Sequence, residues 1–377
     1  MKKIAIIGAG ISGLYFANLL EMDTGFDYKI YEKRPIFNLE ESYGIQLSVN
    51  SIKLLNKIGF KNLSAHEVSY PNKVNFFNAK NNKKICDIDI TKFNDESNRY
   101  TTLKRSILIK FLLNKIPDNK INHNIELKNV KYGEKLNAYF SNNLHESFDY
   151  IIVSDGVFSS TKSIIAEKDI KPIFFNSVAL RGNVKNFDSS DISIFMGSNF
   201  HFVIYPVNQH KEYNFVSIIK KKLSQKQLED EKMFENNDFL QSLISNINQN
   251  TFINLNDNLE NIKSFPIYVS KKLEILNKKN VFFVGDALFS FPPSFAQGAS
   301  QSIETSNDLF DDIKNYNNKL YKERINKINS VNWRSKLNYF AFHINNPILV
   351  YIRNTFLKYL TKNKKFLENY LGKIYRD

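Results

Sequence analysis

The chain has little cysteine, little tryptophan and no long apolar run. Its 377 residues include one cysteine, Cys86, and one tryptophan, Trp333. A single cysteine excludes an internal disulfide, and an apolar strand that begins at Ile4 leaves no room for a signal peptide, so we expect a cytoplasmic protein. No apolar run approaches the roughly 20 residues needed to cross a bilayer. We therefore expect a protein that is soluble, or at most peripheral on the inner membrane face.

Acidic residues are fewer than basic ones, 38 against 52, which gives a net charge of +14. Because the basic residues are scattered and not gathered in one block, we expect no nucleic-acid partner. Near the C-terminus, however, Lys358, Lys362, Lys364 and Lys365 alternate with apolar residues. A basic amphipathic helix of this kind can lie on an anionic membrane, although it more often packs as a helix with a solvated face. Peripheral membrane contact therefore stays open.

A glycine-rich turn follows the first apolar strand. The sequence Gly8-Ala9-Gly10-Ile11-Ser12-Gly13 lies between the strand Lys3–Ile7 and a segment with helical apolar spacing. The three glycines suit a tight turn, close approach of a pyrophosphate and close packing of helix on strand, and the helix N-terminus suits an anion. Glu32, nineteen residues beyond Gly13, ends the next strand. Its carboxylate can accept hydrogen bonds from ribose hydroxyls there. We predict that Lys33 and Arg34 lie beside the adenosine.

Two later stretches complete a flavin dinucleotide site. Asp155-Gly156 follows the apolar strand 150–153, and Asp286 follows the strand 280–284. The Asp286 carboxylate can bind ribityl hydroxyls, and Pro293 shapes a loop against the flavin ring. Gln297-Gly298 opens a helix whose N-terminus would face the ring edge that becomes negative on reduction. Three such stretches in this order predict one bound FAD.

The placement of the motifs predicts an α/β fold. We expect a discontinuous Rossmann-like FAD-binding domain formed by residues 1–70, 99–171 and 267–330. A substrate-binding sheet domain, residues 71–98 and 172–266, is inserted into it, and residues 331–377 form a C-terminal helical segment. Within the sheet domain, 200–207 and 213–220 are expected as neighbouring strands.

The sequence resembles the FAD-dependent aromatic hydroxylases, single-component flavoprotein monooxygenases typified by p-hydroxybenzoate hydroxylase and salicylate hydroxylase. The resemblance covers nearly the whole chain. It is carried by the glycine turn, by Gly44–Asn50, by Arg105, and by the two aspartate motifs. The segments 179–182, 205–207 and 214–216 resemble the substrate-domain strands of that family. Trp333, Ser335, His343 and Arg353-Asn354 resemble its C-terminal helices.

The resemblance implies that NADH or NADPH reduces FAD and that dioxygen forms a flavin C4a-hydroperoxide, which hydroxylates an aromatic, phenolic substrate. No metal is expected, and the protein would be a monomer or homodimer. The implied cofactor-binding residues are Gly8, Gly10, Ile11, Ser12, Gly13, Glu32, Lys33, Arg34, Gln46, Leu47, Arg105, Asp155, Gly156, Asp286, Pro293, Gln297, Gly298, Ala299 and Ser300.

Candidate catalytic residues are His201, Tyr205 and Gln46, and candidate substrate contacts are Tyr205, Arg181 and Pro293. In a strand, residues 201, 203 and 205 share one face and 200, 202 and 204 the other, so His201 and Tyr205 would project together. Either could remove a phenolic proton. His201 can equally be a plain sheet residue, and Arg181 can equally form a salt bridge.

Several departures from the family pattern leave other functions open. Lys162 stands where arginine is usual, Phe289 where histidine is usual, Ala296 where glycine is usual and Ser300 where asparagine is usual. Phe289, Phe291 and Phe295 are either core or the wall of an apolar substrate site. The alternatives are a ubiquinone-pathway hydroxylase of a polyprenylated phenol at the membrane, a flavin-dependent halogenase or reductase, and a catalytically silent FAD-binding protein. A single tryptophan excludes the two-tryptophan motif of tryptophan halogenases.

Overall fold

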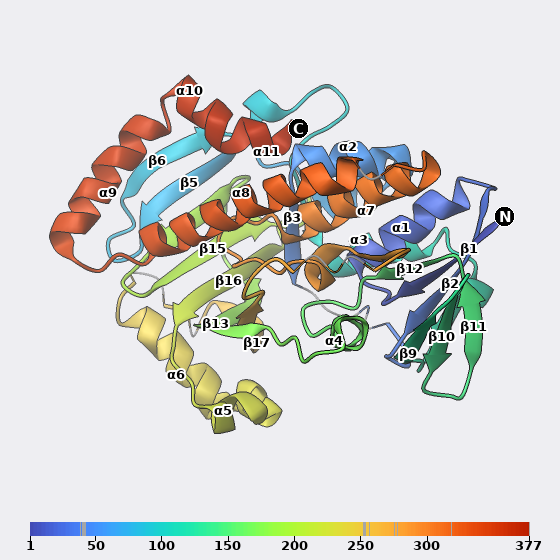
Figure 1. Cartoon of the computed structure of the whole chain (residues 1–377). Coiled ribbons are helices and arrows are strands. Elements are labelled where there is room, and N and C mark those ends of the chain that lie inside the picture. The colour runs from blue at the N-terminus through green and yellow to red at the C-terminus, as the bar shows by residue number, and fades with distance from the viewer. Residues whose placement is uncertain are drawn as a thin grey trace.

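A computed structural model describes residues 1–37, 39, 43–251, 254–255, 257–274, 276, 278–317 and 319–376. Two halves lie side by side in it (Figure 1), one built on a parallel sheet and the other on a larger, mostly antiparallel sheet. The long helix α8 (Lys319–Phe342) runs across both halves. Within the described part of the chain, every helix is too short or too polar to cross a bilayer.

The first half contains a five-stranded parallel sheet in the order β18-β12-β1-β2-β8. Its strands are β1 (Lys2–Ile7), β2 (Phe26–Glu32), β8 (Ile121–His123), β12 (Tyr150–Val153) and β18 (Val281–Phe283). Parallel strands of this kind are apolar because both faces of the sheet are covered. The strand order brings the chain segments that follow β1, β12 and β18 together at one edge.

Both faces of this sheet are packed. Ile4 and Ile6 of β1 contact a core formed with three helices, α1 (Ile11–Glu21), α3 (Arg105–Leu113) and α7 (Gly298–Lys314). Ala5 and Ile7 contact a second core with a three-stranded antiparallel sheet. That sheet consists of β9 (Leu127–Tyr132), β10 (Leu136–Phe140) and β11 (His145–Phe148), and α4 (Ser160–Ala166) packs beside it.

The second half is a seven-stranded sheet in the order β17-β13-β16-β15-β14-β5-β6. Its strands are β5 (Lys73–Asn78), β6 (Lys84–Asp89), β13 (Ile173–Val184), β14 (Ile192–Met196), β15 (Phe200–Pro206), β16 (Tyr213–Lys220) and β17 (Leu259–Val269). All pairs are antiparallel except β14 with β5. That parallel pair joins segments more than a hundred residues apart.

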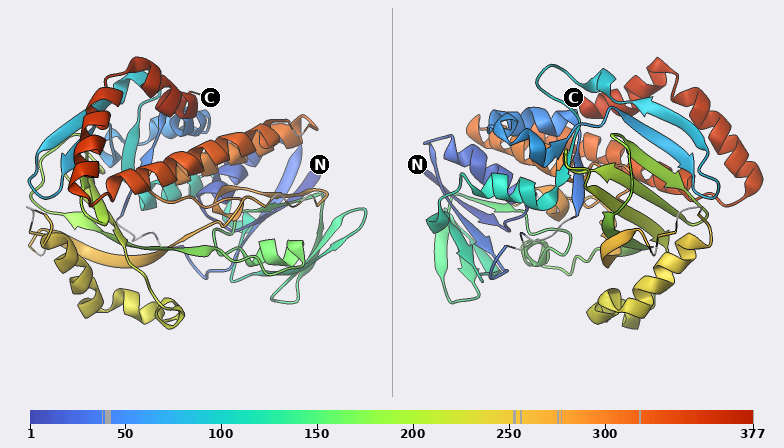
Figure 2. Two further views of the ribbon diagram at one scale, coloured as in Figure 1. Left: turned by 60° about the vertical axis from the view of Figure 1, so that its left-hand side comes forward. Right: turned by 180° about the vertical axis from the view of Figure 1, so that it is seen from behind.

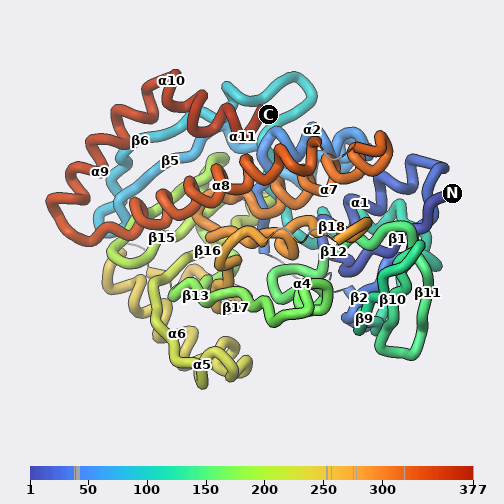
Figure 3. Tube along the Cα trace, in the orientation of Figure 1, coloured from blue at the N-terminus to red at the C-terminus, as the bar shows by residue number. Residues whose placement is uncertain are grey.

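Helices cover both faces of the seven-stranded sheet (Figures 1 and 2). The helices α5 (Gln225–Glu229) and α6 (Asn237–Asn248) lie on one side, where α6 packs on Phe200, Phe202 and Ile204. On the other side the C-terminal segment forms α8, α9 (Pro347–Leu360), α10 (Lys364–Leu367), a π-helical turn Glu368–Gly372 and α11 (Lys373–Tyr375). The trace in Figure 3 shows these last helices beside β5 and β6.

A small sheet and a helix connect the halves. Strands β3 (Gly44–Leu47) and β4 (Val68–Ser69) both pair with β7 (Thr101–Lys104), and α2 (Val49–Lys57) packs on α7. The predicted α/β fold is confirmed, including the neighbouring strands β15 and β16. The sequence did not predict the helices α5 and α6 inside a region that it indicated as strand-rich. The boundaries of the two domains stay a prediction.

Candidate active site

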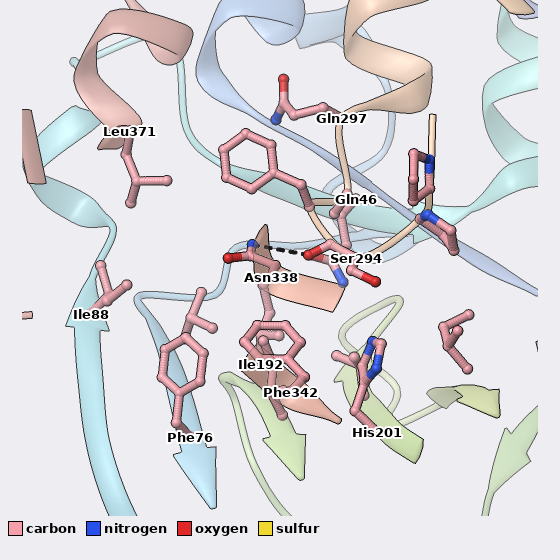
Figure 4. A pocket seen from close by; sticks show the side chains of 18 of the residues that line it. Gln46, Phe76, Ile88, Ile192, His201, Ser294, Gln297, Asn338, Phe342 and Leu371 are labelled. Carbon is pink, nitrogen blue, oxygen red and sulfur yellow. Dashed lines mark hydrogen bonds between the residues drawn. The ribbon is translucent and has the colours of Figure 1, made fainter. Parts of the chain in front are cut away.

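A cavity of about 550 Å³ lies between the halves (Figure 4). One end is formed by the loop 286–299 before and at the start of α7, together with β3. The other end is formed by the face of β5, β6, β14, β15 and β16 and by the C-terminal helices. The cavity therefore extends from the predicted flavin motif to the substrate sheet.

The glycine turn has the geometry of a dinucleotide site. Gly8 has φ +101°, and a Cβ there would lie 2.7 Å from the Asp155 Cα. At Gly13 a Cβ would lie 2.2 Å from the Gly8 carbonyl oxygen, whereas at Gly10 the nearest atom would be 3.9 Å away. Thus Gly8 and Gly13 permit the close packing, and Gly10 leaves the approach open. No side chain caps α1, which begins at Ile11, so the first N–H groups of its turn suit an anion.

Glu32 lies beside this turn at the end of β2. Its Oε2 accepts a hydrogen bond from the Ala9 N–H at 2.8 Å, and its Oε1 accepts one from the Arg34 N–H at 2.9 Å. Lys33 and Arg34 are exposed next to it. The carboxylate is therefore held at the glycine turn by backbone donors and keeps lone pairs for ribose hydroxyls.

Two aspartates have carboxylate oxygens that receive no hydrogen bond from any described group. The Asp155 Oδ1 atom is buried without a hydrogen-bond partner, while its Oδ2 accepts from the Thr161 N–H at 3.3 Å. No described group donates to Asp286, whose exposed side chain opens into the cavity, and desolvation by the surrounding protein raises its pKa from 3.8 to about 6. A position for a Cβ at Gly156 is likewise free of atoms within 4 Å. These carboxylates fit a ligand that brings hydroxyl donors, as FAD does.

The start of α7 faces the cavity without a side-chain cap. Gln297 donates from Nε2 to the Ser48 Oγ at 2.9 Å, and its Oε1 accepts from Gln301 at 3.2 Å. Among the described residues, apart from its chain neighbours and the backbone of its own helix, no atom lies within 4 Å of a Cβ built on Gly298, so a planar ring has room there. Ala296, which precedes Gln297, has φ +51°. This left-handed conformation favours glycine, the residue that the family resemblance predicts here.

The side chains of three predicted cofactor residues make contacts with other parts of the protein. The Ser300 Oγ lies in a hydroxyl cluster with Ser48 and Ser51, 3.1 and 2.9 Å from their Oγ atoms, so its backbone N–H is what remains for a cofactor. Leu47 is fully buried in the core beneath α1 and α7. Arg105 starts α3, where its backbone N–H donates to the Tyr43 carbonyl, and its guanidinium lies 6.0 Å from the Tyr43 ring.

Lys162 of α4 contacts the chain segment that follows Asp286. Its Nζ, inside the protein, donates to the Leu288 carbonyl at 3.1 Å. Burial lowers its pKa, which the charges of Glu274 and Asp155 partly oppose. The lysine thus keeps the loop after Asp286 attached to α4. Phe289 beside it belongs to the core, whereas Phe291 and Phe295 line the cavity.

The predicted alternation of β15 is confirmed. His201, Val203 and Tyr205 line the cavity, and Phe200, Phe202 and Ile204 pack in the core with α6. Burial raises the pKa of Tyr205, which Arg181 and a hydrogen bond with Gln46 partly oppose. Gln46 also accepts at Oε1 from the Tyr100 hydroxyl at 2.8 Å. The Arg181 guanidinium lies 4.7 Å from the Tyr43 ring. The predicted catalytic and substrate residues therefore line one cavity with Pro293.

His201 forms a buried pair with His343, the residue directly after α8. The His201 Nδ1 is 2.9 Å from the His343 Nε2, which is also 3.2 Å from the Ile218 carbonyl oxygen. Burial lowers the pKa of His201 well below its usual range and lowers the pKa of His343 to about 3, so both rings are neutral. Phe342 packs edge-on against His201, with ring centroids 5.1 Å apart.

Several cavity residues were not predicted from the sequence. Tyr100, Asn338 and Tyr370 are polar groups in the wall, and Asn338 donates to the Ser294 carbonyl at 3.0 Å (Figure 4) while it accepts from the Tyr370 hydroxyl at 2.5 Å. The far wall is apolar and includes Phe76, Ile88, Ile192, Phe342 and Leu371. Local patterns indicate that these residues are buried, but not that they meet around one space.

Comparison with known proteins matches residues 1–316 to the family described as FAD binding domain. The chain is 22% identical over 226 residues to a 3-amino-4-hydroxybenzoate 2-monooxygenase of Streptomyces platensis, a match that covers 58% of this chain and 56% of that enzyme. It is 22% identical over 321 residues to a 6-hydroxynicotinate 3-monooxygenase of Bordetella bronchiseptica, with 80% of each covered. The match to the first of these relatives thus spans about half of its length.

Solved structures share the fold over the full length. HpxO of Klebsiella pneumoniae, in complex with FAD and uric acid, superposes with a TM-score of 0.83 at 15% identity and covers 99% of this chain and 96% of its own. A salicylate hydroxylase substrate complex superposes with a TM-score of 0.74 at 16% identity and covers 100% and 97%. At these identities the likeness shows the fold alone.

Proposed function

Since the chain belongs to the FAD-binding domain family of the aromatic hydroxylases, we propose that it is an FAD-dependent monooxygenase that uses NADH or NADPH and dioxygen to hydroxylate a small aromatic compound. The observation that carries the proposal is one cavity with the flavin-ring motif and Gln46 at one end, and with His201 and Tyr205 on the sheet at the other end. Reduced FAD would supply the oxygen activation. The residues of the chain bind the substrate, orient it and exclude water.

His201 serves in this proposal as a hydrogen-bond donor to a substrate oxygen. The Ile218 carbonyl oxygen only accepts, so the proton near it belongs on the His343 Nε2. The His201 Nδ1 is then an acceptor, and neutral His201 carries its proton on Nε2, on the ring edge toward the cavity. His343 is thus a positioning residue that selects the tautomer of His201. In this proposal His201 acts as a donor, in place of the base that the sequence predicts.

Tyr205 and Gln46 complete the polar wall. Burial keeps the Tyr205 hydroxyl protonated at neutral pH, so it too is a donor. Arg181, which lines the cavity, attracts a carboxylate or phenolate through its guanidinium charge. Donors together with the guanidinium of Arg181 favour an aromatic substrate with anionic oxygen, such as a hydroxy acid. Residues Ile192, Ile194, Val203 and Val216 would contact its ring.

A second candidate substrate is a phenol with an apolar tail. It is favoured by the reach of the cavity, whose apolar lining continues beyond the sheet to Leu357 and Leu360 of α9. A volume of about 550 Å³ is within the range of ligand-binding cavities and exceeds what a single small ring fills. The polyprenylated phenol considered from the sequence belongs to this class.

The test is turnover by the purified flavoprotein. We expect the protein to carry FAD, and we expect hydroxybenzoates, hydroxypyridines or alkylated phenols to accelerate NADH or NADPH oxidation. Oxygen consumption should match the hydroxylated product measured by mass spectrometry. Formation of hydrogen peroxide alone with every compound would contradict the proposal. A protein that binds FAD but turns over none of these compounds would leave the catalytically silent FAD-binding alternative, and one that binds no FAD would contradict the proposal.

A further inference from the structure

The helix α9 presents an apolar face outward. Six large apolar or aromatic side chains of this 14-residue helix are between 43% and 73% exposed. They are Ile348, Leu349, Tyr351, Ile352, Phe356 and Tyr359. Of the helix, only Arg353 is fully buried. At helical spacing the six form one broad stripe, and an amphipathic helix of a folded protein normally turns such a stripe inward.

The preceding helix continues this face. Trp333, Leu337 and Phe340 of α8 follow one another at helical spacing and are 61%, 40% and 63% exposed. A short turn, residues 343–346, joins them to α9 at the end of the molecule that carries the seven-stranded sheet (Figure 2). Isolated exposed apolar residues are normal, but nine on two consecutive helices indicate an interaction surface.

The charged side chains of this C-terminal segment are all positive. No aspartate or glutamate occurs between Glu323 and Glu368, whereas nine arginines and lysines do. Lys358, Lys362, Lys364 and Lys365 are exposed, and within the described residues none of them forms a salt bridge. The partner of this surface should therefore be anionic as well as apolar.

We propose that the exposed face of α8 and α9, with Lys358 and the three lysines that follow α9, docks on an anionic lipid bilayer. The apolar and aromatic side chains would enter the interfacial region, and the lysines would contact lipid phosphates. A second copy of this chain fits less well, because a two-fold contact would place these lysines against each other. Phe356 belongs both to this face and to the cavity wall, so the cavity extends toward the docking surface.

The experiment is co-sedimentation of the FAD-loaded full chain with vesicles, which requires no turnover and is thus independent of the proposed hydroxylation. The vesicles contain phosphatidylcholine, with or without phosphatidylglycerol. We expect binding to the anionic vesicles and weaker binding in high salt. The triple variant Ile348→Ser, Ile352→Ser, Tyr359→Ser should bind at least about tenfold more weakly. Replacing the four lysines by glutamine should weaken binding roughly fivefold for each lysine.

Matched controls carry the same kinds of change elsewhere. Met22→Ser, Tyr132→Ser and Ile173→Ser remove three exposed apolar side chains, and Lys80→Gln, Lys83→Gln, Lys226→Gln and Lys232→Gln remove four exposed charges. Both controls should bind vesicles like the unchanged protein. The proposal is overturned if the unchanged protein stays in the supernatant with anionic vesicles, or if the controls lose as much binding. It is also overturned if the apolar triple variant abolishes self-association in sedimentation velocity while no variant changes vesicle binding.

Discussion

The two ends of the cavity are built differently. At the flavin end a few polar atoms have defined positions: Asp286 without a donor, Gln297 bonded to Ser48, and an uncapped helix N-terminus. At the far end the wall is mainly apolar and comes from β5, β6, β14 and the C-terminal helices. Directional groups suit a cofactor whose atoms are fixed, and apolar walls select by shape. The difference predicts that flavin binding and substrate choice can be changed separately.

The largest effect should follow from a change at the flavin end. Asp286→Ala removes a carboxylate that has room for two hydroxyl donors, and hydrogen bonds to a charged group are the strong ones. We expect the affinity for FAD to fall at least about a hundredfold, measured by fluorescence titration of the apoprotein. Asp188→Ala, which changes a side chain that is 86% exposed, is the control and should bind FAD normally. Equal affinity in both variants would remove Asp286 from the site.

The same carboxylate predicts a pH dependence. Because the pKa of Asp286 is raised to about 6 without ligand, the folded apoprotein keeps a proton that the unfolded chain loses near pH 4. The free energy of unfolding of the apoprotein should therefore decrease as the pH rises from about 4 to about 6, the window between the two pKa values. FAD affinity should increase over the same window, since ribose-type hydroxyls donate to the charged form. In Asp286→Asn both slopes should be reduced, as measured by thermal unfolding and FAD titration.

The next effect concerns a polar group on the sheet side of the cavity. His201→Phe keeps a ring but removes the Nε2 donor, so we expect kcat/KM to fall roughly 10- to 100-fold with FAD retained. His201→Gln keeps a donor and should recover part of the loss. No inflection near pH 6.5 from His201 is expected in kcat/KM, because its pKa lies well below that value. An inflection there that disappears in His201→Phe would restore the role of a base.

A smaller effect is expected from filling the far end. Val203 lies between His201 and Tyr205 on the cavity face of β15. Val203→Phe should leave FAD affinity unchanged and raise KM about tenfold, because overpacking of this size costs about 1 to 3 kcal/mol. Val203→Thr has the same shape and should change KM little. Loss of FAD from Val203→Phe would show that the two ends cannot be changed separately.

The smallest effect is expected from relieving one strained backbone conformation at the flavin end. Ala296 has φ +51°, a conformation that glycine adopts without strain. Ala296→Gly should therefore stabilise the protein by about 1 kcal/mol and raise Tm by about 2 °C, measured by thermal unfolding. Asn280→Gly, at φ +61°, is the matched control and should gain less, because asparagine tolerates this region. A lower Tm for Ala296→Gly would show that the backbone at Ala296 is not strained.

The parts of the fold that could be predicted are those with a local signal. The turn at Gly8 and the strand face shared by His201 and Tyr205 follow from spacing within a few residues. The helix α6 was missed although Asn236 caps it and Leu243, Ile244 and Ile247 have helical spacing, because the surrounding strands dominated the prediction. The pairing of β5 with β14 has no local signal at all, since each strand carries only its own alternation.

The site residues that could be predicted are those that lie together in short sequence motifs. Gly8 to Gly13, Asp155 and Asp286 are recognisable because cofactor chemistry constrains neighbouring residues together. The His201–His343 pair joins residues 142 positions apart, and neither position differs from an ordinary buried histidine in sequence. Tyr100 and Asn338 reach the cavity only through the packing of separate elements. Such groups become identifiable only in three dimensions.

The cavity wall combines residues from both ends of the chain, which has a consequence for folding during translation. Gly44 and Gln46 line it from near the start of the chain, and Leu371 and Tyr375 line it from more than three hundred residues later. Contacts between such distant segments slow folding, because long loops must close before the contacts form. The nascent chain therefore cannot enclose the cavity until residue 375 has been translated. During translation its apolar wall stays open to water and to chaperones.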